Sequence, residues 1–303
     1  MAMSLLDRLA GRAPVPVFAC IGPGMQAVTE HALLSPRLRR AASPREAAVL
    51  LRAGAIPERA AAAFGRVHDQ LPHPRAVLRW DGQGDPADVI TDAWVDLLNG
   101  ADSDTDRRSD EPPNPWEGKG DHGQGGEGMM GGVPYGRPMA MTGDDIRDGL
   151  QLDAYTATVG PFAPMLPPGL TLEITLQGDV IISTSVTAPP FPQGDEASAP
   201  HLCAARLLRL LGLNAAAARV ARGSSPRALW TRGAIPAGLG EAAKGEDVRA
   251  RLSAWLAGQA GPYQAPRIGS MLPGLEWHEA MLVLNSYAPD ALHRACAEEE
   301  EAA

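Results

Sequence analysis

Short apolar segments alternate with segments of helical length over residues 1–98. The strand-like segments are residues 15–20, 48–51 and 76–80, and the helix-like segments that follow each of them are residues 25–34, 58–71 and 85–98. A repeat of this kind joins parallel strands, because each crossover helix returns the chain to the same end of the sheet. We therefore expect a parallel α/β unit over residues 1–98.

The periodicity ends at residue 99. Residues 99–138 are first acidic and then glycine-rich, and they contain too few apolar side chains to compensate for the entropy of ordering them. We expect a linker here, whose second half, residues 125–137, docks on a partner because it carries apolar side chains that a flexible spacer does not need. The candidate contacts are Met129, Met130, Tyr135 and Arg137.

Strand-like patterns return after the linker without helices between them. The expected strands are residues 152–159, 170–176 and 180–186, and the expected helices are residues 201–213, 247–256 and 277–284. The acidic tail, residues 298–301, is typical of a solvated helix end. The sequence thus predicts an α+β unit over residues 139–303 with a small antiparallel sheet.

Charge and cysteine content exclude several classes of protein. The net charge is −9 and the basic residues are scattered, which argues against nucleic-acid binding. The three cysteines, Cys20, Cys203 and Cys296, form no disulfide framework or paired metal-binding spacing, so we expect a reducing compartment.

The N-terminal segment lacks the continuous apolar core of a signal peptide, and the chain has no apolar run long enough to cross a bilayer. We expect a cytoplasmic chain without a transmembrane segment of its own.

Two glycine-rich segments leave open a nucleotide-binding module as an alternative. Residues 118–136 have no preceding strand and no Lys–Ser/Thr pair after them. Gly22-Pro23-Gly24 lies between a strand and a helix but lacks the third glycine of a dinucleotide-binding loop. The seven histidines show no metal-ligand spacing, so we expect no metal site.

Two sequence motifs in the N-terminal unit are distinctive enough to indicate a family resemblance. Ser43-Pro44-Arg45 precedes an apolar strand, and residues 66–75 read Arg-Val-His-Asp-Gln-Leu-Pro-His-Pro-Arg. Through them, residues 42–80 resemble the small subunit that carries the terminal iron–sulfur cluster in respiratory complex I (NADH-quinone oxidoreductase) and in nickel–iron hydrogenases. The resemblance implies a flavodoxin-like N-terminal unit.

The second half resembles the start of the partner large subunit. Residues 159–164 read Val-Gly-Pro-Phe-Ala-Pro, and residues 176–180 read Leu-Gln-Gly-Asp-Val. These segments, within residues 150–182, are similar to the family's Gly-Pro-Gln-His-Pro hairpin and its Leu-x-Gly-Glu turn. The resemblance implies a fusion of the small subunit with the start of the large subunit.

Both halves depart from the family at its functional residues. The family holds its cluster with four cysteines, whereas Ala19-Cys20-Ile21 keeps one thiol, and the next ligand position is Gln83. In the family, the hairpin of the large subunit presents histidine to the quinone headgroup; the aligned positions here are Ala163 and Pro167, and neither side chain can donate a hydrogen bond. The resemblance thus implies a chain without catalytic residues or cofactors, in which Cys20 is a remnant of the cluster site. Cys20 is then a buried small hydrophobe or, alternatively, a lone reactive thiol.

We therefore expect a structural subunit of an ion-translocating, complex I-like assembly, peripheral on the inner face of the cell membrane. The expected partners are antiporter-like membrane subunits. The candidate contacts are two apolar, proline-rich loops, residues 162–168 and 189–192, with Phe162, Pro164 and Leu166 in the first. The alternative is an electron-transferring oxidoreductase subunit that completes an iron–sulfur site at Cys20 with a partner chain.

Overall fold

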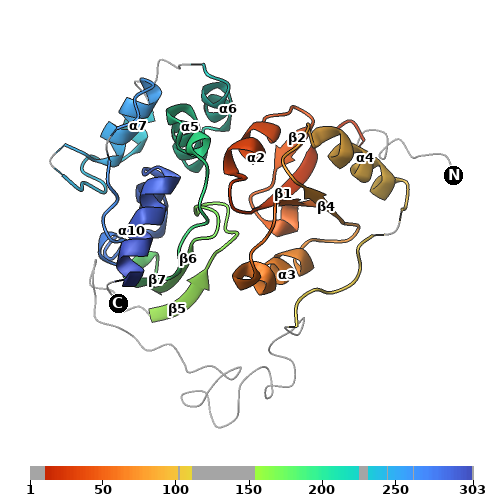
Figure 1. Ribbon diagram of the computed structural model, residues 1–303, viewed down its shortest axis with the longest axis horizontal. Coiled ribbons are helices and arrows are strands. Elements are labelled where there is room, and N and C mark those ends of the chain that lie inside the picture. The colour runs from red at the N-terminus through yellow and green to blue at the C-terminus, as the bar shows by residue number, and fades with distance from the viewer. Residues whose placement is uncertain are drawn as a thin grey trace, which may run out of the picture.

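The computed structural model describes residues 11–101, 103–110, 154–224, 231–243, 245–261 and 263–301. They form two units, a parallel α/β unit and an α+β unit with a small antiparallel sheet (Figure 1). This confirms the expected fold class. Within these residues, no helix is both long and apolar enough to cross a membrane.

The N-terminal unit is a four-stranded parallel sheet with helices. Its strands are β1 (Val15–Ile21), β2 (Leu38–Arg40), β3 (Val49–Ala53) and β4 (Ala76–Trp80), in the order β2-β1-β3-β4. Its α-helices are α2 (Gln26–Ala32), α3 (Ala61–Asp69) and α4 (Ala87–Leu98). The central strands β1 and β3 are covered on both faces, which explains why their sequences are almost continuously apolar.

Residues 103–109, expected to belong to the linker, lie against the N-terminal unit. The Asp69 carboxylate accepts hydrogen bonds from the backbone N–H groups of Arg108 and Ser109, each at 2.9 Å. His68 is fully buried between Asp69 and Asp104, with ring nitrogens 2.8 and 3.4 Å from their carboxylate oxygens. These contacts fix the segment along α3. The candidate contacts Met129, Met130, Tyr135 and Arg137 lie outside the described residues.

The C-terminal unit packs helices around one long, buried helix. Its antiparallel strands are β5 (Ala154–Val159), β6 (Thr171–Gln177) and β7 (Val180–Ala188). Its α-helices are α5 (Pro200–Leu210), α6 (Asn214–Ala221), α7 (Val248–Leu256), α8 (Ile268–Met271), α9 (Trp277–Asn285) and α10 (Pro289–Glu301). Every residue of α5 from Leu202 to Leu208 is buried, so α5 is the core of this unit.

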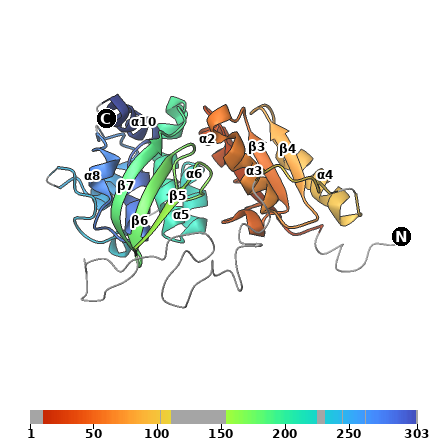
Figure 2. The same ribbon diagram turned by 90° about the horizontal axis from the view of Figure 1, so that it is seen from below.

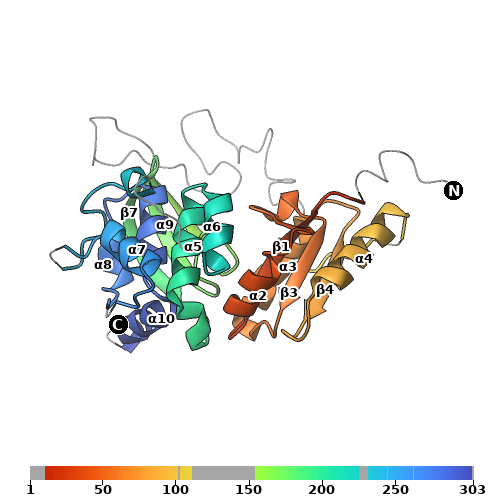
Figure 3. The same ribbon diagram turned by 90° about the horizontal axis from the view of Figure 1, so that it is seen from above.

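The two units meet through α2 on one side and through α5 and α6 on the other, as two views agree (Figures 1 and 3). Ala27 of α2 belongs to the apolar core of the C-terminal unit. In the opposite direction, Phe162 and Phe191 of the C-terminal unit enter the core of the N-terminal unit, where Phe162 makes an edge-to-face contact with Phe64. The view from below shows the two sheets on either side of this contact (Figure 2). Each unit therefore contributes side chains to the other's core.

Candidate functional site

Cys20, which the resemblance implies to be the remnant of a cluster site, is fully buried on β1. It pairs with Arg52 of β3 in the strand register and belongs to an apolar cluster with Phe18, Leu50 and Phe162. Burial raises the pKa of the Cys20 thiol far above its ordinary value, so the thiol stays protonated at neutral pH. This environment suits a small hydrophobe and does not suit a reactive thiolate.

The residues around Cys20 do not fit an iron–sulfur cluster. A cubane cluster needs four thiolates. The chain has three cysteines, and Cys203 and Cys296 lie in the core of the C-terminal unit on α5 and α10. Burial is also the largest influence on Cys203, whose pKa rises to about 11. No step of electron transfer through a cluster can be built from this set of thiols.

The loop that follows β1 is closed by the C-terminal unit. The backbone N–H of Gly24 donates to the Pro192 carbonyl at 2.9 Å, and that of Gln26 donates to Oε1 of Gln193 at 3.0 Å. A phosphate would need these same N–H groups at the start of α2. Gly22 is required for packing here, since a Cβ atom would lie 2.4 Å from the Ala55 carbonyl oxygen. The nucleotide-binding alternative is therefore not supported at this loop.

The two proline-rich loops that we expected to contact partners instead contribute to the contact between the units. Phe162 and Leu166 are buried within the chain, and in this loop Pro164 is exposed. In the second loop Phe191 is buried beneath Arg59, whose guanidinium carbon lies 4.8 Å from the ring centroid. The exposed surface left for a partner is thus smaller than the sequence suggests.

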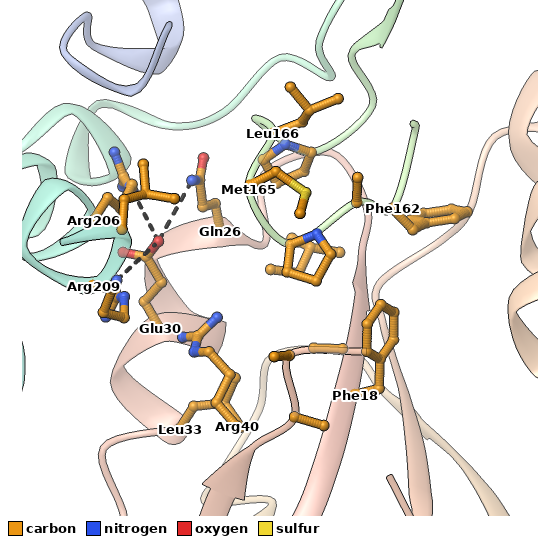
Figure 4. Close-up of a pocket in the computed structure, with 18 of the residues that line it drawn as sticks. Phe18, Gln26, Glu30, Leu33, Arg40, Phe162, Met165, Leu166, Arg206 and Arg209 are labelled. Atoms are coloured by element: carbon orange, nitrogen blue, oxygen red, sulfur yellow. Dashed lines mark hydrogen bonds and ion pairs between the residues drawn. The ribbon is translucent and has the colours of Figure 1, made fainter. Parts of the chain in front are cut away.

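A cavity of about 610 Å³ lies between the units. One wall is formed by β1, α2 and β2 of the N-terminal unit, and the other by residues 161–168 and α5 of the C-terminal unit (Figure 4). This volume is within the range of about 300–1,000 Å³ that ligand-binding cavities have. The cavity is the candidate functional site of the described residues.

A charged cluster forms one end of the cavity. The carboxylate of Glu30, on α2, lies 2.8 Å from Nε of Arg206 and 3.6 Å from Nη2 of Arg209, both on α5 (Figure 4). Burial would raise the pKa of Glu30, but the two arginines outweigh burial and hold that pKa below its ordinary value. Arg206 also donates to the Ala197 carbonyl at 2.5 Å. Glu30 is therefore an ionised, buried carboxylate that joins the two units.

Arg40 extends from the end of β2 into the same cavity, with its guanidinium below Glu30 (Figure 4). The surrounding protein and repulsion from Arg209 both lower its pKa, and Glu30 raises it in part. An arginine with a lowered pKa is still charged at neutral pH. Arg40 thus adds a positive charge near the cluster that Glu30 alone does not neutralise.

The sequence motifs did not identify this cluster. Glu30 and Arg40 lie in one unit and Arg206 lies far along the chain in the other, and the three form no motif of fixed spacing. Two arginines spaced by three on one face of α5, a helix whose other residues are mostly apolar, are the signal that could have found it. The family resemblance pointed instead to the hairpin that carries Ala163, which lines the same cavity.

Comparison of the chain with protein-family models, with curated proteins and with solved structures found no match.

Proposed function

We propose that the chain is a cofactor-free structural subunit of a membrane-associated, ion-translocating assembly of the complex I/hydrogenase type. The proposal rests on the resemblance of residues 42–80 and 150–182, and on one observation about the site. The end of β1, where the family places its cluster ligands, is covered by Pro192 and Gln193 of the chain's own C-terminal unit. In the proposed role, the residues after β1 therefore hold the two units together and bind no cluster.

The contact between the units supports a structural role. Glu30 is paired with Arg206 and Arg209 across the contact, and Phe162 packs on Phe64. Arg59 donates to the carbonyl of Pro189 at 2.8 Å in addition to its contact with Phe191. Apolar, charged and backbone contacts all cross the boundary between the units, and together they restrain relative motion of the units, as a scaffold between larger subunits requires.

The alternative function is electron transfer through an iron–sulfur site completed by a partner chain. It requires the Cys20 sulfur to reach ligands outside this chain. Cys20 is 0% exposed, with Phe18 and Phe162 in the same apolar cluster. Electron transfer through Cys20 would therefore require the two units to separate, whereas the structural role requires no change in the contact between them.

Affinity purification of the full chain from native membranes in a mild detergent tests the proposal. We expect antiporter-like membrane subunits to co-purify, with an iron content that does not scale with the amount of this chain. A matched variant replaces residues 125–137 by a Gly/Ser sequence of equal length, and we expect it to recover less of the membrane subunits. A chain that is recovered alone, or iron in a fixed ratio to it, would contradict the proposal.

A further inference from the structure

The cavity between the units carries more positive charge than its own acidic group neutralises. Four arginines line it, Arg39, Arg40, Arg206 and Arg209, together with one carboxylate, that of Glu30. Arg39 forms an ion pair at 3.8 Å with Glu46, which does not line the cavity. The other three arginines of the lining face a single carboxylate, that of Glu30, which leaves an excess of two positive charges.

Arg40 is the arginine of the cavity lining for which the described part of the chain supplies no direct partner. Among the described residues, no carboxylate lies within ion-pair distance of its guanidinium and no acceptor within hydrogen-bond distance. The guanidinium points into the cavity and approaches the cluster of Glu30 and Arg209 (Figure 4). Arg40 is exposed to solvent, which screens its repulsion from the other arginines in part, but like charges that line one cavity still favour the entry of an anion.

The opposite wall of the cavity is apolar. Its lining includes Phe162, Met165 and Leu166, and Figure 4 shows Met165 facing Arg40 across the space. A small inorganic anion on Arg40 would leave this wall in contact with water. An apolar chain attached to the anion would bury it, which is favourable in proportion to the apolar area removed from water.

We propose that this cavity binds a single-chain anionic amphiphile, whose phosphate or carboxylate head lies between Arg40 and Arg209 and whose chain lies against Met165 and the neighbouring apolar residues of the segment 161–168. This binding site does not depend on the proposed structural role, because every residue that it uses belongs to this chain.

Titration calorimetry on the purified full chain tests the proposal with three probes, each below its critical micelle concentration where it has one. Dodecyl phosphate carries both features, inorganic phosphate carries the charge alone, and dodecyl maltoside carries the chain alone. We expect one dodecyl phosphate to bind per chain, at least about ten-fold more tightly than either of the other probes. Equal affinity for inorganic phosphate would show a simple anion site, and equal affinity for the maltoside would show a site for apolar chains; either result overturns the proposal, as does no binding.

Variants locate the site. Arg40→Gln is expected to weaken the binding of dodecyl phosphate at least about ten-fold, since it removes a charge-assisted hydrogen bond, and Arg40→Lys is expected to retain part of the affinity. Arg37→Gln is the matched control, because Arg37 is three residues away and pairs with Asp88 outside the cavity. Should Arg40→Gln fail to fold, Met165→Gln tests the apolar wall, with the same direction expected. Wild-type affinity in both Arg40→Gln and Met165→Gln would overturn the proposal.

Discussion

Nε of Arg206 lies 2.8 Å from Oε1 of Glu30, although 176 positions separate the two residues in the sequence. Both side chains are less than a tenth exposed, and one belongs to each unit. Gln26 adds its side-chain amide to the same oxygen at 3.5 Å. A buried ion pair of this kind adds little net stability over an apolar pair, but it strongly penalises any state in which one partner is left alone.

We predict that Glu30→Gln destabilises the protein by about 3–5 kcal/mol, because the buried Arg206 and the partly buried Arg209 lose the carboxylate that neutralises them. Urea denaturation of the full chain measures the effect. Glu46→Gln is the control, since Glu46 is half exposed in its pair with Arg39, and we expect a change of at most about 0.5 kcal/mol. Equal effects in the two variants would show that the pair with Arg206 does not join the units.

A second prediction concerns the aromatic contact between the units. Phe162→Ala removes a ring that is 7% exposed and lies 6.4 Å from the ring of Phe64, so we expect a loss of about 3–5 kcal/mol. Because Phe162 packs across the contact between the units, its loss should weaken the coupling of the two units. We therefore expect them to unfold in two separate thermal transitions. Tyr155→Ala, on the exposed face of β5, is the control. A single transition at the wild-type temperature would contradict the account.

The sequence predicts most of the strands, because their apolar patterns are strong. The expected segment 76–80 matches β4, and the expected segments 15–20 and 170–176 match β1 and β6 to within one residue at each end. The ends of the helices are predicted less accurately. The single helix expected over 58–71 is a short 3-10 turn, Glu58–Ala60, followed by α3.

Elements that depend on tertiary contacts are not predicted. β2 has three residues, two of them exposed arginines, and it forms a strand because it pairs with β1. α6 directly follows the expected helix 201–213; the chain turns at Gly212, whose φ of +75° ends α5. The charged cluster around Glu30 depends on the packing of two units, and no local pattern encodes that packing.

The segment after α4 should detach at low pH. Hydrogen bonds from Arg108, His68 and Ser109 outweigh the effect of burial and hold the pKa of Asp69 below its ordinary value. A carboxylate with a lowered folded-state pKa stabilises the fold above its unfolded pKa of about 4, and that stability is lost as the pH falls through the folded-state value. We predict that Asp69→Asn lowers the free energy of unfolding at pH 7, and that the difference from wild type shrinks below about pH 4.

Urea denaturation between pH 2 and pH 7 checks this prediction, with Asp88→Asn as the control. Asp88 is 74% exposed in its pair with Arg37, so its replacement should have little effect at any pH. A difference between Asp69→Asn and wild type that stays constant over the range would show that the Asp69 charge does not hold the segment.

The thiols should be unreactive in the folded protein. Cys20, Cys203 and Cys296 are all buried, and burial raises the pKa of the first two, so their nucleophilic thiolate forms are rare at neutral pH. We predict that an aromatic disulfide reagent titrates none of them rapidly in buffer and titrates all three in guanidinium chloride. A rapid reaction of one thiol that disappears in Cys20→Ala would support the reactive-thiol alternative.

The most direct test of the structural role is complementation of a strain that lacks this chain. Assembly of the membrane complex is followed on native gels, and its activity is measured in the same membranes. We predict that Cys20→Ala, which costs about 1–2 kcal/mol of stability, restores both assembly and activity to the wild-type level, because the proposed structural role requires no electron transfer through this chain. Restored assembly without activity would show that Cys20 takes part in electron transfer, and assembly that does not need the chain would contradict a structural role.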